Sequence, residues 1–288
     1  MPRDTVPRDT ETPEPGSPRG PLRHPLSFVR RSNRLNPRRQ RAWDAALGHE
    51  LLTIPRGERD TAVADDFRID WRAEFGREAE LILEIGTGSG EAVAHAAAQH
   101  PEKNFLAVEV YRPGVAQLVS RLRREGLTNV RVADVDATEL IDKLLPHDSV
   151  DELWVFFPDP WHKTKHNKRR LIQEGFVHRA AKILPDGGIW RLATDWSGYA
   201  VQMRETISAS PAFTNAHTGQ RTGEDSPLTA VKHQGLERGQ PMPYEQAIDD
   251  VGGWAPRFAG RVETDFEARA HQAGRRIFDL TFVRTPRD

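Results

Sequence analysis

Short apolar segments alternate with helix-like segments along this 288-residue chain, and this alternation restricts the fold more than any other feature. Strands are expected over 81–85, 105–110, 129–133, 152–157, 189–193 and 276–283. Helices are expected over about 90–99, 113–125, 168–184 and 197–209. Such a pattern predicts an α/β fold with a mostly parallel sheet and helices on both faces. Ligands of these sheets bind at the carboxyl ends of the strands.

The composition excludes several classes of protein. With no cysteine, the chain cannot be a disulfide scaffold, a thiol enzyme or a protein with a Cys-ligated metal. The longest aliphatic and aromatic run covers 153–157, far short of the roughly 20 residues of a membrane span. No secretory signal pattern follows Met1. We therefore expect a cytoplasmic protein without membrane contact.

The first residues differ in composition from the rest of the chain. Residues 1–25 contain seven prolines and almost no large apolar side chains, so burial cannot offset the entropy of ordering them. We expect a disordered Pro/Arg-rich extension over 1–26 and a single domain over 27–288.

The net charge of −1 hides blocks of opposite sign. Eight arginines and no acidic residue lie between Arg19 and Arg41. Residues 60–159 carry twenty acids and ten bases, whereas 161–182 carry seven bases and one acid. Basic blocks on either side of an acidic one fit contact with a polyanion. Solvated surface segments are the alternative.

A glycine-rich turn, EIGTGSGE at 84–91, follows the first expected strand. Gly86, Gly88 and Gly90 allow a tight turn and close approach of a ligand. The dinucleotide fingerprint needs glycine where Glu91 stands, and a phosphate-binding Walker loop needs a Gly-Lys pair that is absent. Since Glu84 would repel a pyrophosphate, the turn favours S-adenosylmethionine, with a purely packing role as the alternative.

Two further acids stand at the ends of the next two strands. Glu109 is placed to accept hydrogen bonds from ribose hydroxyls, and Asp136 to contact an adenine edge. Each alone could be a solvated loop acid. Together with Glu84 they mark three successive strand ends, which supports binding of S-adenosylmethionine.

The segment 156–162, FFPDPWH, follows the fourth strand. Prolines on both sides of Asp159 restrict the backbone and fix the direction of its carboxylate. Trp161 offers a face for base stacking. His162 and His166 have metal-ligand spacing but no evident third ligand, so we expect no metal. The basic side chains that follow suit phosphate contacts: Lys163, Lys165, His166, Lys168, Arg169 and Arg170.

Two more segments should face the same edge of the sheet. Asp195 ends the fifth strand in a Thr-Asp-Trp sequence. Thr264 to Glu267 (TDFE) precedes the last strand and also matches a helix capping box, which is the structural alternative.

These motifs together resemble the bacterial tRNA (guanine-N7-)-methyltransferase family. The resemblance covers roughly 27–285 and rests on EIGTGSGE, FLAVEV, the Asp-Ala pair at 136–137, FFPDPWHKTKHNKRR, TDW and TDFE, with SFVRRSNRLNPRRQ at its start. It implies a Rossmann-like class I methyltransferase with a seven-stranded sheet. It also implies transfer of a methyl group from S-adenosylmethionine to a guanosine of the tRNA variable loop, conventionally position 46, to form 7-methylguanosine.

The resemblance assigns roles to residues of this chain. Asp159 is the implied catalytic residue and also lies near the cofactor. The other implied cofactor residues are Glu84, Gly86, Gly88, Gly90, Glu109 and Asp136. The implied substrate contacts are Lys163, Asp195, Thr264, Asp265, Phe266 and Glu267. Weaker candidates for the tRNA backbone are Arg30, Arg31, Lys165, Lys168, Arg169 and Arg170.

Two features depart from the family pattern, the Pro-rich extension and the acid at Asp265. Guanine N7 carries no proton, so the reaction needs positioning rather than a general base. Asp159 and Asp195 are then expected to bind the N1 and N2 edge and to stabilise the cationic product. We expect a monomer, with a homodimer as the alternative. A small-molecule methyltransferase and a catalytically silent RNA-binding protein remain as other interpretations.

Overall fold

The structure, a computed structural model, describes residues 27–28, 34–234 and 248–287. The predicted extension 1–26 lies outside these residues, as do Arg30 and Arg31. Residues 235–247 also lie outside the described part of the chain. No helix in the described part of the chain is long and apolar enough to span a membrane.

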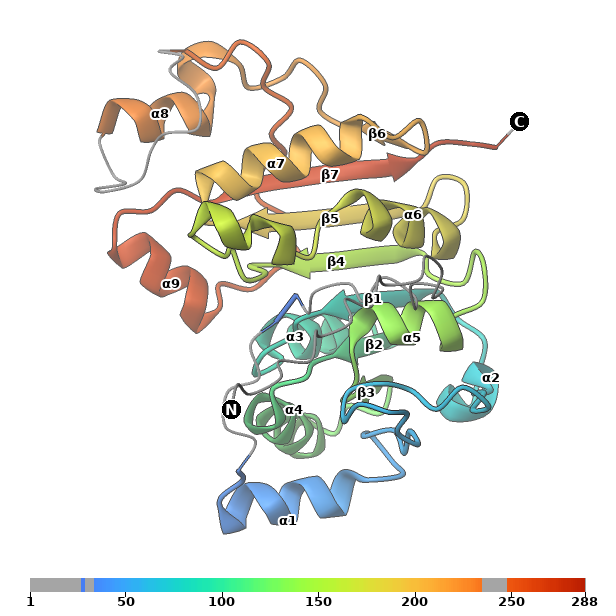
Figure 1. The fold of residues 1–288 in the computed structure, drawn as a ribbon. Coiled ribbons are helices and arrows are strands. Elements are labelled where there is room, and N and C mark those ends of the chain that lie inside the picture. Colours follow the sequence, from blue (N-terminus) through green and yellow to red (C-terminus); the bar gives the residue numbers. More distant parts are fainter. Residues whose placement is uncertain (1–26, 29–33, 235–247, 288) are drawn as a thin grey trace, which may run out of the picture.

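A seven-stranded sheet forms the centre of the molecule, with the order β3-β2-β1-β4-β5-β7-β6 (Figure 1). The parallel strands are β1 (Leu81–Ile85), β2 (Asn104–Val108), β3 (Val130–Ala133), β4 (Glu152–Phe156) and β5 (Ile189–Thr194). β7 (Phe278–Arg284) pairs antiparallel with β5 and with β6 (Phe213–Asn215). The predicted α/β fold with a mostly parallel, seven-stranded sheet is confirmed.

Helices cover both faces because successive strand residues point to opposite sides. Leu81, Leu83 and Ile85 pack in one core with α5 (Ala137–Leu144), α6 (Glu174–Ile183) and α7 (Ser197–Ser208). Ile82 packs in a second core with α3 (Glu91–Gln99) and α4 (Arg112–Glu125). α1 (Pro37–Ala46) lies against α4. The remaining helices are α2 (Trp71–Phe75), α8 (Pro227–Gln234), α9 (Asp265–Gln272) and the 3-10 turns η1 (Thr164–Arg169) and η2 (Gly223–Asp225).

The expected helix over 168–184 was wrong over 168–173. The chain forms η1, then extends, and α6 begins only at Glu174. Ile172 explains the break, because its side chain is fully buried and its N–H donates to the Tyr199 hydroxyl at 3.0 Å. A continuous helix would withdraw both contacts. α1, in contrast, was missed although Asn36 caps it and Pro37 begins it, a recognised start signal.

The strand order reverses at β1 and β4, which are neighbours although β2 and β3 lie between them in the chain. Such a switch point opens a crevice at the carboxyl ends of the two strands. The glycine-rich turn follows β1 and the PDPW segment follows β4. α9 lies at this edge of the sheet (Figure 1).

Candidate active site

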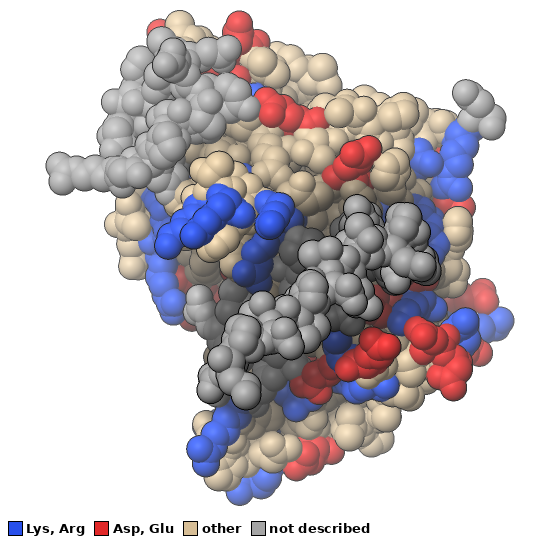
Figure 2. Space-filling view, viewed as in Figure 1, with Lys and Arg blue, Asp and Glu red and all other residues tan. Residues whose placement is uncertain are grey.

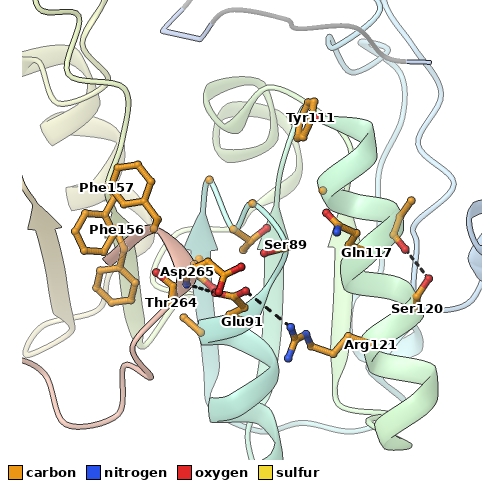
Figure 3. A pocket seen from close by; sticks show the side chains of 18 of the residues that line it. Ser89, Glu91, Tyr111, Gln117, Ser120, Arg121, Phe156, Phe157, Thr264 and Asp265 are labelled. Carbon is orange, nitrogen blue, oxygen red and sulfur yellow. Dashed lines mark hydrogen bonds and ion pairs between the residues drawn. The ribbon is translucent and has the colours of Figure 1, made fainter. Parts of the chain in front are cut away.

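A cavity of about 940 Å³ lies at this edge. Its wall is built from the glycine-rich turn, the start of α3, one face of α4, the end of β4, and the starts of α1 and α9 (Figure 3). The predicted site residues in the wall are Glu84, Gly86, Gly88, Thr264, Asp265 and Phe266. Glu84 and Thr264, which are 180 residues apart in the chain, therefore meet in one wall.

The glycine-rich turn requires two of its glycines for the cavity and one for packing. Gly86 and Gly88 have φ of +78° and +56°, and a Cβ at either position would meet open space. A side chain there would therefore partly fill the site. At Gly90 (φ +73°) a Cβ would overlap the Leu118 side chain of α4, so this glycine brings α3 and α4 together and does not line the cavity.

Glu84 is a buried acid without a hydrogen-bond partner for its Oε2 atom among the described residues. Burial, and next the negative charge of Glu109, raise the pKa of Glu84 from 4.5 to about 8. An uncompensated carboxyl in a cavity wall is costly unless a ligand satisfies it. A cationic group in the cavity would provide that compensation and lower the pKa again.

Glu109 holds the glycine-rich turn in place. Its Oε2 accepts from the Gly88 N–H at 2.8 Å, and its Oε1 accepts from Val110 and Tyr111 at 2.7 and 2.8 Å. Burial raises its pKa, while these backbone hydrogen bonds act in the opposite direction. Oε1 accepts two hydrogen bonds and Oε2 only one, so Oε2 retains a lone pair with which the predicted ribose contact is compatible.

Asp136 caps α5 and is buried. Its Oδ1 accepts from the Thr138 N–H at 2.8 Å and from the Thr138 hydroxyl at 2.6 Å. The residue is not part of the cavity wall described above. The adenine contact of Asp136 therefore stays a prediction.

These residues fit S-adenosylmethionine. The Glu84 carboxyl lacks a partner for one oxygen, the cavity contains no bulky side chain at Gly86 or Gly88, and Phe156 and Phe157 supply apolar wall. A methionine ammonium suits Glu84, since opposite charges compensate each other best where solvent is excluded.

The PDPW loop is constrained at both ends. Phe157 and Trp161 have φ of +52° and +47°, a left-handed conformation that is strained for aromatic residues and typical of functional sites. The guanidinium of Arg170 donates to the Pro160 carbonyl at 2.7 Å and to Gln202 Oε1 at 2.6 Å. Asp159 is exposed at the tip of this loop, available to a substrate.

Arg170 corrects one of our expectations. It is buried, with 6% of its surface exposed, and its hydrogen bonds go to the loop and to α7. The residue therefore supports the PDPW loop from inside instead of presenting charge to phosphate. No local sequence pattern distinguishes it from the exposed bases beside it.

The exposed bases of this segment are Lys163, Lys165 and Lys168. Lysine and arginine side chains gather over η1 and beside α9 in Figure 2. The Arg169 guanidinium lies 3.9 Å from the centre of the Trp161 ring. That contact covers one face of the indole, so base stacking on Trp161 would use the other face or displace Arg169.

Asp195 is buried at the end of β5. Its Oδ2 lies 2.6 Å from the Arg275 guanidinium. The rings of His162 and Trp196 lie 4.2 Å apart between centroids, so the loop after β4 contacts the loop after β5. The two predicted guanine-binding acids thus stand on adjoining loops, although neither is in the cavity wall.

The 264–267 segment divides into two parts. Thr264 caps α9 by accepting from the Glu267 N–H at 3.2 Å, as the structural alternative predicts. The Glu267 carboxylate is fully buried between Arg257 and Arg261, with contacts of 2.9 and 3.0 Å. Of these four residues, Thr264, Asp265 and Phe266 line the cavity and Glu267 does not. Phe266 packs on Phe157, with ring centroids 5.0 Å apart.

Comparison with known proteins identifies the family. A family model described as "Putative methyltransferase" matches residues 78–280. The tRNA (guanine-N(7)-)-methyltransferase of Paenarthrobacter aurescens is 52% identical over 273 residues, which are 90% of this chain and 91% of that protein. The proteins of the same name from Arthrobacter sp. and Bifidobacterium longum are 48% and 42% identical, covering 90% and 92% of this chain and 86% and 91% of theirs. The chain belongs to the tRNA (guanine-N7-)-methyltransferase family.

Several residues of the cavity wall in this member of the tRNA (guanine-N7-)-methyltransferase family were not predicted from the sequence. A Cβ on Gly114 would overlap the Gly88 carbonyl, so this glycine lets α4 approach the turn. Its Arg-Pro-Gly context at a helix start was the available signal. The other missed residues include Glu91, Gln117, Arg121, Arg124 and Arg269. Among the described residues, no group of three or more His, Asp or Glu side chains could hold a metal ion.

Proposed function

We propose that this protein transfers the methyl group of S-adenosylmethionine to N7 of a guanine in tRNA, forming 7-methylguanosine, with the variable-loop guanosine at position 46 as the target and the cytoplasm as its location. Family membership supports the reaction. The observation that carries the proposal is the cavity in which the glycine-rich turn, the base of the PDPW loop and the start of α9 meet.

The mechanism assigns binding and orientation to the cofactor side of the site. When bound, S-adenosylmethionine supplies an electrophilic methyl group on a cationic sulfur. Glu84 takes the ammonium group, and Glu109 fixes the turn and accepts from the ribose. Gly86 and Gly88 leave the space that close approach requires.

The substrate side needs no general base, because guanine N7 offers a lone pair and carries no proton. Asp159 accepts from the guanine N1 and N2 donors and stabilises the positive charge that develops on the purine. The strained residues Phe157 and Trp161, with Arg170 beneath the loop, hold Asp159 in position. Asp195 also binds the base, after the Arg275 side chain has moved away from its carboxylate.

The exposed lysines contact the phosphates of the tRNA backbone. Lys163, Lys165 and Lys168 project from the same loop and turn as Asp159, so phosphate contacts there place the guanosine near the cavity. Adenine lacks the N1 and N2 donors, which gives acids at this edge a means to reject it.

A small-molecule methyltransferase would leave this basic segment without a role. A silent RNA-binding protein would keep Glu84 buried and uncompensated with no gain.

The test uses tRNA from cells that lack this enzyme. The full chain is incubated with this tRNA and methyl-labelled S-adenosylmethionine, and the tRNA is digested to nucleosides. We expect label in 7-methylguanosine alone, at one site that maps to position 46. Label in another nucleoside, or none in tRNA, would contradict the proposal.

A further inference from the structure

Glu91 joins the two halves of the site, and neither the motifs nor the proposed mechanism gives it a role. It is the first residue of α3 and follows Gly90, the last glycine of the turn. Its Oε2 accepts from the Asp265 N–H at 2.9 Å, a contact between residues 174 positions apart in the chain. Figure 3 shows the carboxylate between the start of α9 and the Arg121 side chain of α4.

This hydrogen bond occupies a position that the start of α9 would otherwise leave open. The first N–H groups of a helix have no partner within the helix. The Thr264 hydroxyl accepts from the Glu267 N–H, and the Glu91 carboxylate accepts from the Asp265 N–H. A carboxylate at a helix N-terminus also gains from the helix dipole, and Glu91 stands at the start of both α3 and α9.

The second oxygen of Glu91 faces α4. Oε1 lies 4.0 Å from the Arg121 guanidinium, and 19% of the Glu91 side chain is exposed. Glu91 therefore connects three walls of the cavity, α3, α4 and α9. Phe266, one residue beyond Asp265, continues the connection by packing on Phe157 at the base of the PDPW loop.

We propose that Glu91 is a positioning residue that couples the cofactor turn to the start of α9, where the family resemblance implies substrate contacts at Thr264, Asp265 and Phe266. Binding at the turn fixes α3, and through Glu91 it fixes the Asp265 N–H and the first turn of α9. Binding of one ligand then removes part of the ordering cost of the other, which is positive coupling. The inference rests on the proposed function.

The experiment measures tRNA dissociation constants for the full chain with and without saturating S-adenosylhomocysteine, the cofactor product, which cannot react. For the wild-type protein we expect tRNA to bind at least about fivefold more tightly with the product present. Glu91→Ala should reduce that ratio to about one, because it removes the acceptor of the Asp265 N–H. Glu91→Gln keeps an acceptor oxygen and should retain most of the ratio.

Two controls separate this role from general stability. Glu125→Ala removes another Arg121 partner, at 3.9 Å, outside the cavity wall, and should leave the ratio unchanged. Asp265→Ala and Asp265→Pro both remove the Asp265 carboxylate, but only Asp265→Pro also removes the N–H that Glu91 accepts. Proline is tolerated at this first helical position, and Thr264 before it already has an extended backbone. This second pair of variants gives an answer even where Glu91→Ala fails to fold.

We expect Asp265→Pro to lose the coupling and Asp265→Ala to retain it. Wild-type coupling in both Glu91→Ala and Asp265→Pro, or a ratio of one in the wild-type protein, would overturn the role of Glu91. A wild-type protein that forms no 7-methylguanosine contradicts the proposed function instead, so the two failures are distinguishable.

Discussion

The acids predicted to bind the cofactor and those predicted to bind the substrate are compensated in opposite ways. Within the described part of the chain, Glu84 and Glu109 form no ion pair with lysine or arginine, and their burial raises both pKa values. Asp195 and Glu267 are buried too, but each contacts arginine, at 2.6 Å to Arg275 and 2.9 Å to Arg257.

This difference assigns different chemistry to the two sides. On the cofactor side, backbone N–H groups offset part of the charge of Glu109, whereas a cationic ligand would compensate Glu84. The substrate side has balanced its charge within the protein, so a ligand there must compete with an arginine or use a neighbouring group. Asp159 is the exception, because it is exposed on a strained loop.

The largest expected effect concerns the arginine-bound acids. Glu267→Ala leaves Arg261, which is fully buried, with Asp279 as its remaining acidic contact, and it leaves Arg257 without this partner. We expect the free energy of unfolding in urea to fall by about 3–5 kcal/mol. The matched change Glu263→Ala, at an exposed acid of the same segment, should cost less than about 1 kcal/mol. If both variants were equally stable and Glu267→Ala lost tRNA binding, Glu267 would be a substrate contact and not a structural residue.

The second prediction concerns Asp159, the exposed acid on the PDPW loop. Asp159→Ala should lower kcat by at least about a hundredfold, because a preorganised charge next to the reacting base is lost. The dissociation constant for S-adenosylmethionine should change only a few-fold. Asp66→Ala, at an exposed acid away from the cavity wall, is the control for both measurements. Wild-type turnover in Asp159→Ala would show that the strained loop serves another purpose.

Glu84 should make stability depend on pH. The folded protein holds this proton up to about pH 8, whereas the unfolded chain loses it near 4.5. The folded state therefore binds more protons between these values, and stability falls as pH rises. From pH 6 to 8 we expect the wild-type protein to lose about 2 kcal/mol more than Glu84→Gln in urea unfolding. Parallel curves for the two proteins would contradict the raised pKa.

The exposed lysines should give the smallest effect. Replacing Lys165 and Lys168 with glutamine should weaken tRNA binding and make its salt dependence shallower, by about one logarithmic unit of slope for each base lost. Arg72→Gln, on α2 at the opposite side of the molecule (Figure 1), should leave the slope unchanged. An unchanged slope in the double variant would exclude phosphate contact at η1.

The sequence predicted the sheet, and the placement of Glu84 and Glu109 at one edge of it, for a local reason. The short apolar runs 81–85 and 152–156, each followed by turn residues, are typical of buried strands. Parallel strands then bring Glu84 and Glu109 to one edge of the sheet. The PDPW loop was predictable as rigid because proline restricts its own backbone and that of the residue before it.

The substrate side was harder because its geometry depends on distant partners. The sequence distinguishes neither Arg170 from Arg169 nor Glu267 from Asp265, and their roles are set by Pro160 and Gln202 in one case and by Arg257 and Arg261 in the other. The contact between Glu91 and Asp265 has no local signal at all. The late start of α6 likewise depends on Tyr199, which accepts the Ile172 N–H.

Proton release on cofactor binding tests the contrast between the two sides most directly. Calorimetry of S-adenosylmethionine binding at pH 7, in buffers of different ionisation enthalpy, counts the protons that leave the protein. Since Glu84 is uncharged at this pH in the free protein and charged beside an ammonium group, we expect release of about one proton, and little in Glu84→Gln. Binding without proton release, or equal release from both proteins, would contradict the account.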